Sequence, residues 1–296
     1  INSSFHKINL FIYILYMSTI KSKRLAIYYS YPSSVNATYT VAGAINVFKE
    51  YQLLVLGAGL EDISHPDHAN TVAIIAGLPA NTMVFGYVDA VLPLANFKTK
   101  VDNWKLMNVA GIFCDRFGYD FGLTRVGQND EVDYIHSKSL VAFVNAWNAD
   151  DACAPTIDTV THLNNKDWIL AESYQIINDN YEDLAEWKLR SEKLMGYQHS
   201  IGINVAGITT TLTGVFDQNK FDYAYFSAIM YGFDAFGWGE QDFSAITAQL
   251  PYRQRKKYFG NLYVSDVENK DGVFVRNTNV GFKVNTVTRT VDYVLN

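Results

Sequence analysis

Short β-rich runs alternate with segments of helical period along most of this chain, and this alternation is the strongest constraint on its fold. It is the pattern of βα units around a parallel sheet. Eight such units predict a closed (β/α)8 TIM barrel, because an open doubly wound sheet usually has fewer strands. The eight runs are 25–31, 52–57, 82–88, 109–115, 140–145, 168–172, 202–206 and 234–238.

Segments of helical period fill most of the connections between these runs. We predict helices near 37–49, 67–77, 97–107, 129–138, 182–197 and 221–231. The connection 148–166 is long and poorly periodic, so its helix is the least well defined.

The C-terminal part of the chain has a different period. Segments 272–276, 280–284 and 288–294 alternate apolar and polar residues with a period of two, and Asn-containing turns separate them. We therefore expect a small antiparallel β appendage. The predicted organisation is an N-terminal extension or leader-like segment at 1–24, the barrel at 25–260 and the appendage at 261–296.

The N-terminal segment admits two interpretations. Residues 8–16 are apolar and follow Lys7, as in the core of a signal peptide, and they are too few to span a bilayer, so no stable membrane insertion is expected. No small-residue cleavage site follows, and Met17 is an alternative start. A secreted or cell-surface location is favoured if residues 1–20 are a signal segment, and the two cysteines do not decide the compartment.

The charge balance argues against nucleic acid as a partner. The formal net charge of the 296 residues is -6 and the isoelectric point is near 5.5, so no basic face is available to neutralise phosphates. The one basic cluster is the run 253–257, which we interpret as a solvated helix face.

Two carboxylates each end an apolar run. Asp115 closes the run 109–115 and Glu172 closes the run 168–172. An acid at the end of a buried strand is poorly solvated, so it costs stability unless it is paired, hydrogen-bonded or used. Strand alternation places Phe113 on the same face as Asp115, and Leu170 on the same face as Glu172. If these faces point into the barrel, the two carboxylates converge on one mouth.

A structural explanation of the two acids stays open at this point. Asp115 would form an ion pair with Arg116 or Arg125, and Glu172 would cap a loop. The strand-end position of both acids together favours a functional role.

Other strand ends and the loops after them carry polar and aromatic side chains. Aromatic residues form 15% of the chain, and aromatic rings stack on the apolar faces of sugars while acids and amides bind sugar hydroxyls. Most of the phenylalanines are expected in the core. The candidate substrate-binding residues are Tyr29, Tyr31, Tyr87, Asp89, Arg116, Asp120, Asn145, Trp147, Tyr174, Trp238 and Glu240.

The sequence does not contain complete motifs for dinucleotide, phosphate or metal binding. Gly57 and Gly59 match the start of a dinucleotide-binding fingerprint, but Asp62 replaces its third glycine. His65 and His68 lack a third metal ligand in register. Because the chain has no phosphate-binding loop, no Gly-x-Ser-x-Gly elbow and no Cys-x-x-Cys pair, we expect neither a cofactor nor a metal.

Several of these segments together resemble a family of glycoside hydrolases. The segments 86–89, 111–115 with Asp120, and 171–174 resemble endo-α-1,4-polygalactosaminidase-like and related TIM-barrel hydrolases, and the C-terminal segments 273–276 and 281–285 resemble their ending. The resemblance implies that Asp115 and Glu172 are the catalytic pair. Asp89 departs from the third-strand motif of the family, which leaves the substrate less defined than the reaction.

We therefore expect an endo-acting glycoside hydrolase that cleaves an α-linked polysaccharide, with galactosamine-containing polymers as the implied substrate. Burial should raise the pKa of Glu172 and suit it to act as the general acid, and Asp115 near Arg116 would act as nucleophile or base, although the roles can be exchanged. The alternative is a catalytically inactive TIM barrel that serves as a carbohydrate-binding or structural module. A sugar-phosphate lyase or aldolase would need a strand-end lysine or a phosphate loop, and neither is evident. The oligomeric state is not predicted.

Overall fold

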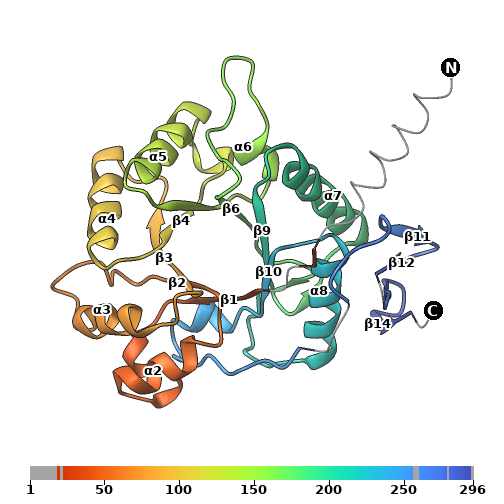
Figure 1. Ribbon diagram of the computed structural model, residues 1–296, viewed down its shortest axis with the longest axis horizontal. Coiled ribbons are helices and arrows are strands. Elements are labelled where there is room, and N and C mark those ends of the chain that lie inside the picture. Colours follow the sequence, from red (N-terminus) through yellow and green to blue (C-terminus); the bar gives the residue numbers. More distant parts are fainter. Residues whose placement is uncertain (1–18, 21–22, 256–259, 279, 295–296) are drawn as a thin grey trace.

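The computed structural model describes residues 19–20, 23–255, 260–278 and 280–294, and in this part of the chain eight parallel strands close a TIM barrel, as predicted (Figure 1). The predicted extension 1–24 lies mostly outside the described residues. The strands run around the barrel in sequence order, and the last pairs with the first. They are β1 (Lys23–Tyr28), β2 (Leu53–Leu56), β3 (Met83–Asp89), β4 (Gly111–Asp115), β5 (Val141–Asn145), β6 (Trp168–Ala171), β9 (Asn204–Ile208) and β10 (Ala235–Gly237).

Helices surround the barrel and agree with the predicted segments to within a few residues, except near residue 37. There the chain forms the 3-10 helix η1 (Pro32–Ala37) before α2 begins. The connection 148–166 contains only a short helix. The α-helices are α2 (Val41–Phe48), α3 (His68–Gly77), α4 (Leu94–Leu106), α5 (Arg125–Ser137), α6 (Ala149–Cys153), α7 (Leu184–Ser200) and α8 (Gln218–Met230).

Side chains at alternate strand positions fill the barrel interior. Phe85, Phe113, Phe143, Trp168 and Leu170 belong to one buried cluster inside the barrel. The rings of Phe113 and Phe143 meet edge to face, with centroids 5.1 Å apart. Both strand faces predicted to point inward therefore do so, and their last members reach the same end of the barrel.

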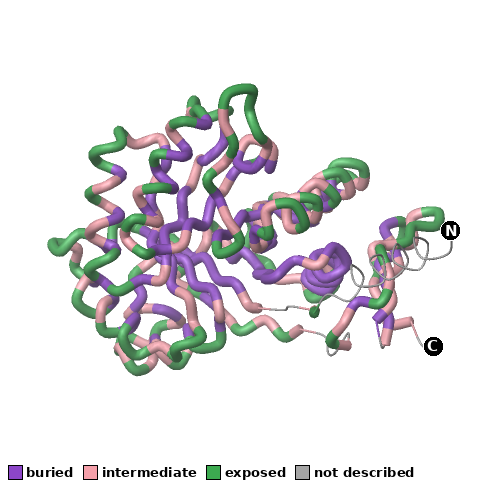
Figure 2. The backbone as a smooth tube through the Cα atoms, turned by 45° about the horizontal axis from the view of Figure 1, so that its top comes forward, coloured by how far each residue is buried: buried purple, intermediate pink, exposed green. Residues whose placement is uncertain are grey.

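The C-terminal strands form the predicted antiparallel sheet, which packs against α8. The sheet consists of β11 (Glu268–Lys270), β12 (Val273–Arg276), β13 (Phe282–Asn285) and β14 (Thr290–Tyr293), of which β11 was not predicted. The helix α8 is covered by the barrel on one side and by this sheet on the other, so its residues from Phe221 to Met230 are all buried (Figure 2). This explains why these buried residues are apolar or aromatic except for Asp222 and Ser227.

The eighth βα unit lacks its α-helix within the described residues. After β10 the chain forms a 3-10 helix, η3 (Gln241–Ser244), and residues 245–255 then continue without regular structure. The prediction of a solvated helix face at 253–257 is wrong for its described residues. Arg253 pairs with Glu240, and Arg255 donates to the carbonyl oxygens of Lys23, 2.9 Å away, and Phe236, 2.5 Å away.

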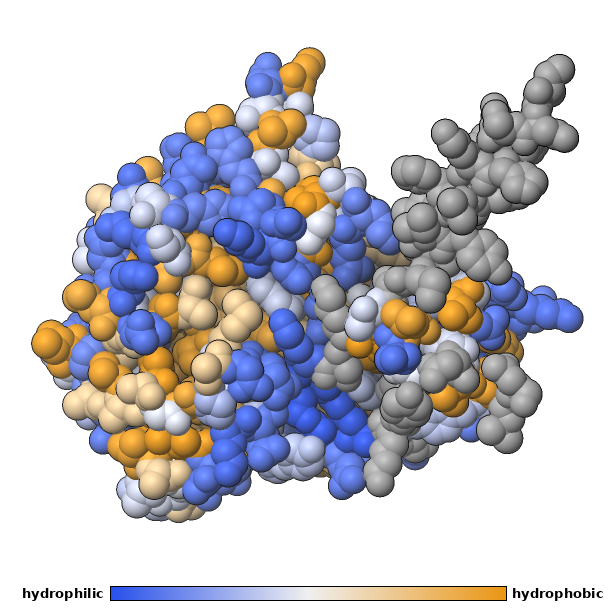
Figure 3. All heavy atoms as spheres, viewed as in Figure 1, coloured by the Kyte–Doolittle hydropathy of each residue, from blue (hydrophilic) through white to orange (hydrophobic). Residues whose placement is uncertain are grey.

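A short hairpin, β7 (Ile176–Ile177) with β8 (Asn180–Tyr181), precedes α7 and was not predicted. On the face drawn in Figure 3, hydrophobic side chains over α2, α3 and α4 are interspersed with hydrophilic ones. Leu106 at the end of α4 is exposed, and single exposed hydrophobic residues of this kind are common on protein surfaces and do not indicate a binding site. Among the described residues, no helix combines the length and apolar character needed to cross a bilayer.

Candidate active site

Three adjacent strands bring Asp115, Asn145 and Glu172 together at the carboxyl end of the barrel. Asp115 is the last residue of β4, Asn145 is the last residue of β5, and Glu172 directly follows β6. Since β5 pairs with both β4 and β6, the amide of Asn145 lies between the two acids. All three side chains follow inward-facing positions of their strands, so they form the uppermost layer of the barrel interior.

The amide nitrogen of Asn145 donates to both carboxylates. Its Nδ2 lies 2.9 Å from Oδ1 of Asp115 and 2.7 Å from Oε2 of Glu172, so these two oxygens are at most about 5.6 Å apart, the sum of the two lengths. Because a carboxylate only accepts and an amide NH₂ group has two hydrogens, one amide satisfies both acids and fixes their spacing.

Two tyrosines lie beside the acids at the same level of the barrel. The hydroxyl of Tyr87 donates to Oδ2 of Asp115 at 3.0 Å, and the rings of Tyr29 and Tyr87 meet edge to face with centroids 5.4 Å apart. Burial and the neighbouring charge of Asp115 raise the pKa of Tyr87, so this hydroxyl keeps its proton and remains a donor. Burial also raises the pKa of Tyr29.

Gly57, at the end of β2, makes room for the Tyr29 ring. A methyl group at position 57 would lie 2.6 Å from Cδ1 of Tyr29, which is too close for two carbon atoms. In the sequence this glycine indicates only a weak dinucleotide-binding motif. Its role in the structure is to admit an aromatic ring to the barrel mouth.

Arg116 forms its ion pair with Asp89 and not with Asp115. Its Nε donates to Oδ1 of Asp89 at 3.0 Å, and its terminal amino group pairs with the other oxygen of the same carboxylate. Arg125 is buried and donates to Gln128 and to backbone carbonyls. The structural alternative, in which Asp115 forms an ion pair with Arg116 or Arg125, is therefore wrong.

A pocket of about 360 Å³ opens over the two acids, and we call it the catalytic pocket after the role that the sequence predicts for them. Loop residues after β4 and β5 form its walls, including the predicted Asp120 and Trp147. Phe121, which was not predicted, adds an aromatic wall directly after Asp120. Its position in the loop after a barrel strand was the available signal. The lining residues are Asp115, Arg116, Asp120, Phe121, Asn145, Trp147 and Glu172.

Burial raises the pKa of Glu172, and the negative charge of Asp115 acts in the same direction. The hydrogen bond from Asn145 and the charge of Arg190 oppose this shift. Arg190 also donates to the carbonyl oxygen of Glu172 at 2.8 Å, which fixes the backbone that carries the acid. Glu172 therefore retains its proton to a higher pH than an exposed glutamate does.

A left-handed residue follows each of the two acids. Arg116 has a φ of 57° and Ser173 a φ of 55°, and neither is a glycine. Such backbone is unfavourable for residues with a side chain and is concentrated at functional sites. Here it ends each strand sharply and directs the chain away from the mouth immediately after the carboxylate.

The structure does not bring Tyr174 and Trp238 to the catalytic pocket. The turn at Ser173 places Tyr174 on the outside of the barrel, where it is fully buried and its hydroxyl contacts Ser191. Trp238 follows the inward-facing position of Gly237, so its ring faces outward and packs against Phe216 and Phe221. The expectation that Tyr174 and Trp238 bind substrate is corrected.

Tyr31 and Glu240 also lie apart from the two acids. Tyr31 is exposed, and its ring contacts His65 instead of the pocket. Both carboxylate oxygens of the buried Glu240 accept from Arg253 at 2.8 Å. This pair lines a pocket between the loops after β9 and β10, where many TIM barrels bind phosphate. The acid neutralises the arginine there, which disfavours a phosphate ligand.

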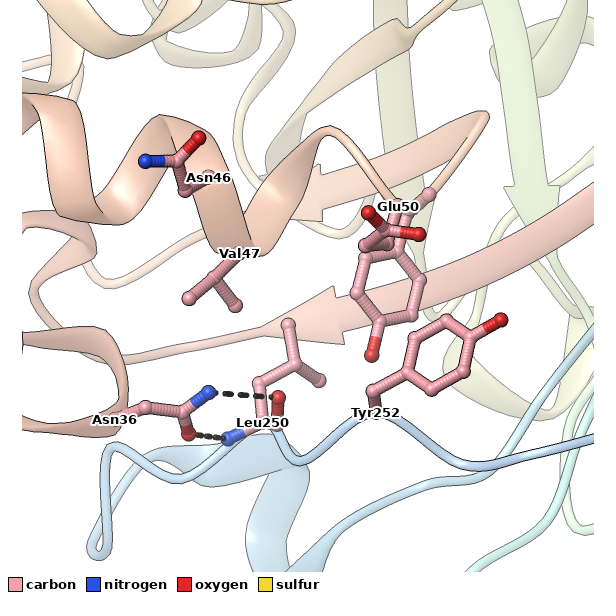
Figure 4. A pocket seen from close by; sticks show the side chains of 7 residues that line it. Asn36, Asn46, Val47, Glu50, Leu250 and Tyr252 are labelled. Atoms are coloured by element: carbon pink, nitrogen blue, oxygen red, sulfur yellow. Dashed lines mark hydrogen bonds between the residues drawn. The ribbon is translucent and has the colours of Figure 1, made fainter.

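A cavity of about 400 Å³ lies between α2 and the irregular segment 245–255 (Figure 4). The side chain of Asn36 bonds to both backbone groups of Leu250 at its edge. The residues that line it include neither acid of the catalytic pocket. Among the described residues, no group of three or more histidine, cysteine or acidic side chains has the arrangement of a metal site.

No protein-family model and no curated protein matches this sequence. The carboxyl transferase domain of Rhizobium etli pyruvate carboxylase with 3-bromopyruvate aligns over 74% of this chain and 40% of its own chain, at 10% identity and a TM-score of 0.47. Leishmania donovani UMP synthase aligns over 73% and 48%, at 12% identity and a TM-score of 0.41. This chain thus spans less than half the length of either structure, and its own strand order establishes the TIM-barrel fold.

Proposed function

We propose that this chain is a glycoside hydrolase that cleaves an α-linked polysaccharide, with Glu172 as the general acid and Asp115 as the nucleophile. The observation that carries the proposal is the amide of Asn145, which donates to both carboxylates at 2.9 and 2.7 Å. Cleavage of a glycosidic bond requires two carboxyl groups at a fixed spacing across an open pocket.

The roles follow from the surroundings of each acid. Burial and the charge of Asp115 raise the pKa of Glu172, so Glu172 holds the proton that a leaving sugar oxygen needs. Tyr87 and Asn145 each donate to a different oxygen of Asp115, and these two hydrogen bonds fix the orientation of this carboxylate at the pocket.

The spacing favours retention of configuration. The two bonded oxygens are at most about 5.6 Å apart, the sum of the two hydrogen-bond lengths. Retaining enzymes have carboxyl groups about 5–5.5 Å apart, whereas inverting enzymes need about 6.5–9.5 Å to admit a water molecule.

In the proposed reaction Glu172 gives its proton to the glycosidic oxygen while Asp115 attacks the anomeric carbon. The bond from that carbon to the leaving oxygen breaks, and an ester between Asp115 and the sugar forms. A water molecule then attacks the same carbon and gives a proton to Glu172. The ester bond breaks, Asp115 becomes a carboxylate again, and the sugar leaves with the water oxygen.

The charges of the catalytic pocket support an amino sugar as substrate. Three acids line it, namely Asp115, Asp120 and Glu172, and its one arginine, Arg116, pairs with Asp89. A protonated sugar amine is complementary to this balance, whereas an anionic polymer is not. The resemblance to polygalactosaminidase-like hydrolases points to the same substrate class.

The test is the release of reducing ends from α-1,4-linked galactosaminan, galactan and glucan by the purified parent and Glu172→Gln. Glu192→Gln is the matched control, because Glu192 is an exposed glutamate on α7 that does not line the catalytic pocket. We expect release by the parent and the control and not by Glu172→Gln, and the first product should keep the α configuration by proton NMR. If no polymer is cleaved but one retains both the parent and Glu172→Gln, the hydrolase proposal is refuted and the chain is a carbohydrate-binding barrel.

A further inference from the structure

Trp147 lies where the catalytic pocket meets a second hollow of similar size. This hollow, which we call the α7 groove, has a volume of about 360 Å³ and is lined by residues at the start of α6 and along α7. Trp147 lines both hollows. The groove is also lined by Asn148, Glu182, Glu186, Leu189, Arg190 and Lys193.

The indole of Trp147 is a fixed and exposed platform. It is 54% exposed, which is unusual for the largest apolar side chain. The guanidinium of Arg190 lies 5.0 Å from the ring centroid, and this arginine is itself held by the carbonyl oxygen of Glu172 at 2.8 Å and by Glu182 at 2.8 Å. The platform is therefore anchored to the same backbone that carries the proposed general acid.

The groove offers polar contacts without a dominant charge. Glu182 is neutralised by Arg190, and Lys193 is paired with Asp150 at 2.6 Å. The carboxylate of Glu186 and the apolar Leu189 also line the groove, together with the amide of Asn148, which bonds to Asp151 and Lys193. An aromatic face with amide and carboxylate groups around it matches a sugar ring, which has apolar C–H faces and a hydroxylated edge.

We propose that the α7 groove binds a further sugar unit of the same polysaccharide chain, with Trp147 as the platform between that unit and the cleavage point. This inference rests on the proposed function. It means that the substrate extends beyond the catalytic pocket and crosses the barrel rim over Trp147. Oligosaccharides long enough to reach the groove are then cleaved more efficiently than shorter ones, as an endo-acting enzyme requires.

The test measures kcat/KM for α-1,4-linked galactosamine oligosaccharides of increasing length with the full chain. For the parent we expect a rise with length once the groove is reached. In Trp147→Ala the ratio between the longest and the shortest substrate should fall about tenfold, which corresponds to the loss of one aromatic contact. Trp147→Phe keeps a ring and should restore part of this ratio, and Glu186→Gln should also lower it.

Glu192→Gln is the control, because it removes the same charge from α7 at a position that does not line the groove. If the parent cleaves these substrates and all variants keep its length dependence, the α7 groove is not a sugar site while the proposed function stands. If the parent cleaves none of them or of the polymers, the proposed function itself fails and this inference falls with it.

Discussion

Asn145 is the residue whose replacement tests the site most directly, because one amide group holds both acids. Asn145→Ala removes two hydrogen bonds, of 2.9 and 2.7 Å, and leaves two carboxyl groups facing each other without a donor between them. Hydrogen bonds to charged groups contribute about 1.5–3 kcal/mol each. Removal of one preorganised donor from an active site lowers kcat by about 10²–10³-fold, and we expect a loss of this size for cleavage by Asn145→Ala.

The same substitution should change the pKa of Glu172. The hydrogen bond from Asn145 lowers this pKa, while burial and Asp115 raise it, so loss of the amide raises the pKa further. The alkaline limb of kcat/KM reports the loss of a proton from the acid in the free enzyme, and it should therefore move to higher pH. Carbon-13 NMR titration of the glutamate side chains measures the same shift without substrate.

The control is Asn219→Ala, since Asn219 is exposed in the first turn of α8 and does not line the catalytic pocket. It should keep the activity of the parent and its Glu172 pKa. If Asn145→Ala matched this control in both kcat and the Glu172 pKa, the amide would not hold the two acids and the reasoning would be wrong.

Two further predictions concern stability. Burial raises the pKa of Glu131 to about 9 from a normal value of 4.5, so its stabilising contribution is complete below pH 4.5 and is lost as the pH rises through about 9. In urea denaturation, the free energy of unfolding of Glu131→Gln should therefore rise relative to that of the parent as the pH increases from 4.5 to about 9. A difference that does not change with pH would contradict the raised pKa of Glu131. Gly57→Ala should cost about 1–3 kcal/mol, because its methyl group would overlap Tyr29, whereas Gly196→Ala at an open position on α7 should stabilise by about 0.5–1 kcal/mol. Equal effects of the two alanines would show that Tyr29 is not confined by Gly57.

Local alternation predicted the barrel and the convergence of the two acids, because strand period is a local property. Asp115 and Phe113 share a face in any extended strand, and the same holds for Glu172 and Leu170. Once eight strands close, faces that point inward must meet at the mouth. The order of the strands and the position of Asn145 between the acids follow from the same argument.

The positions of two aromatic residues were predicted wrongly, because they depend on features that the local alternation of apolar and polar residues does not determine. Trp238 ends a run in which either face was free to point inward, and Gly237 takes the inward position. Ser173 has a left-handed backbone conformation that turns Tyr174 outward, and a serine in the sequence does not predict this conformation. Arg116 pairs with Asp89 at the end of a neighbouring strand. Its proximity to Asp115 in the sequence therefore does not predict its partner.

The placement of α8 between the barrel and the C-terminal sheet makes these two parts one cooperative unit. Phe226 on this helix meets Phe282 of the sheet with ring centroids 6.1 Å apart, and Phe221 on the same helix meets Phe236 of the barrel at 5.9 Å. Detachment of the sheet would expose one apolar side of α8 to water while the other side still packed on the strands. The sheet therefore does not behave as an exchangeable module, and its loss would weaken the barrel wall next to β10.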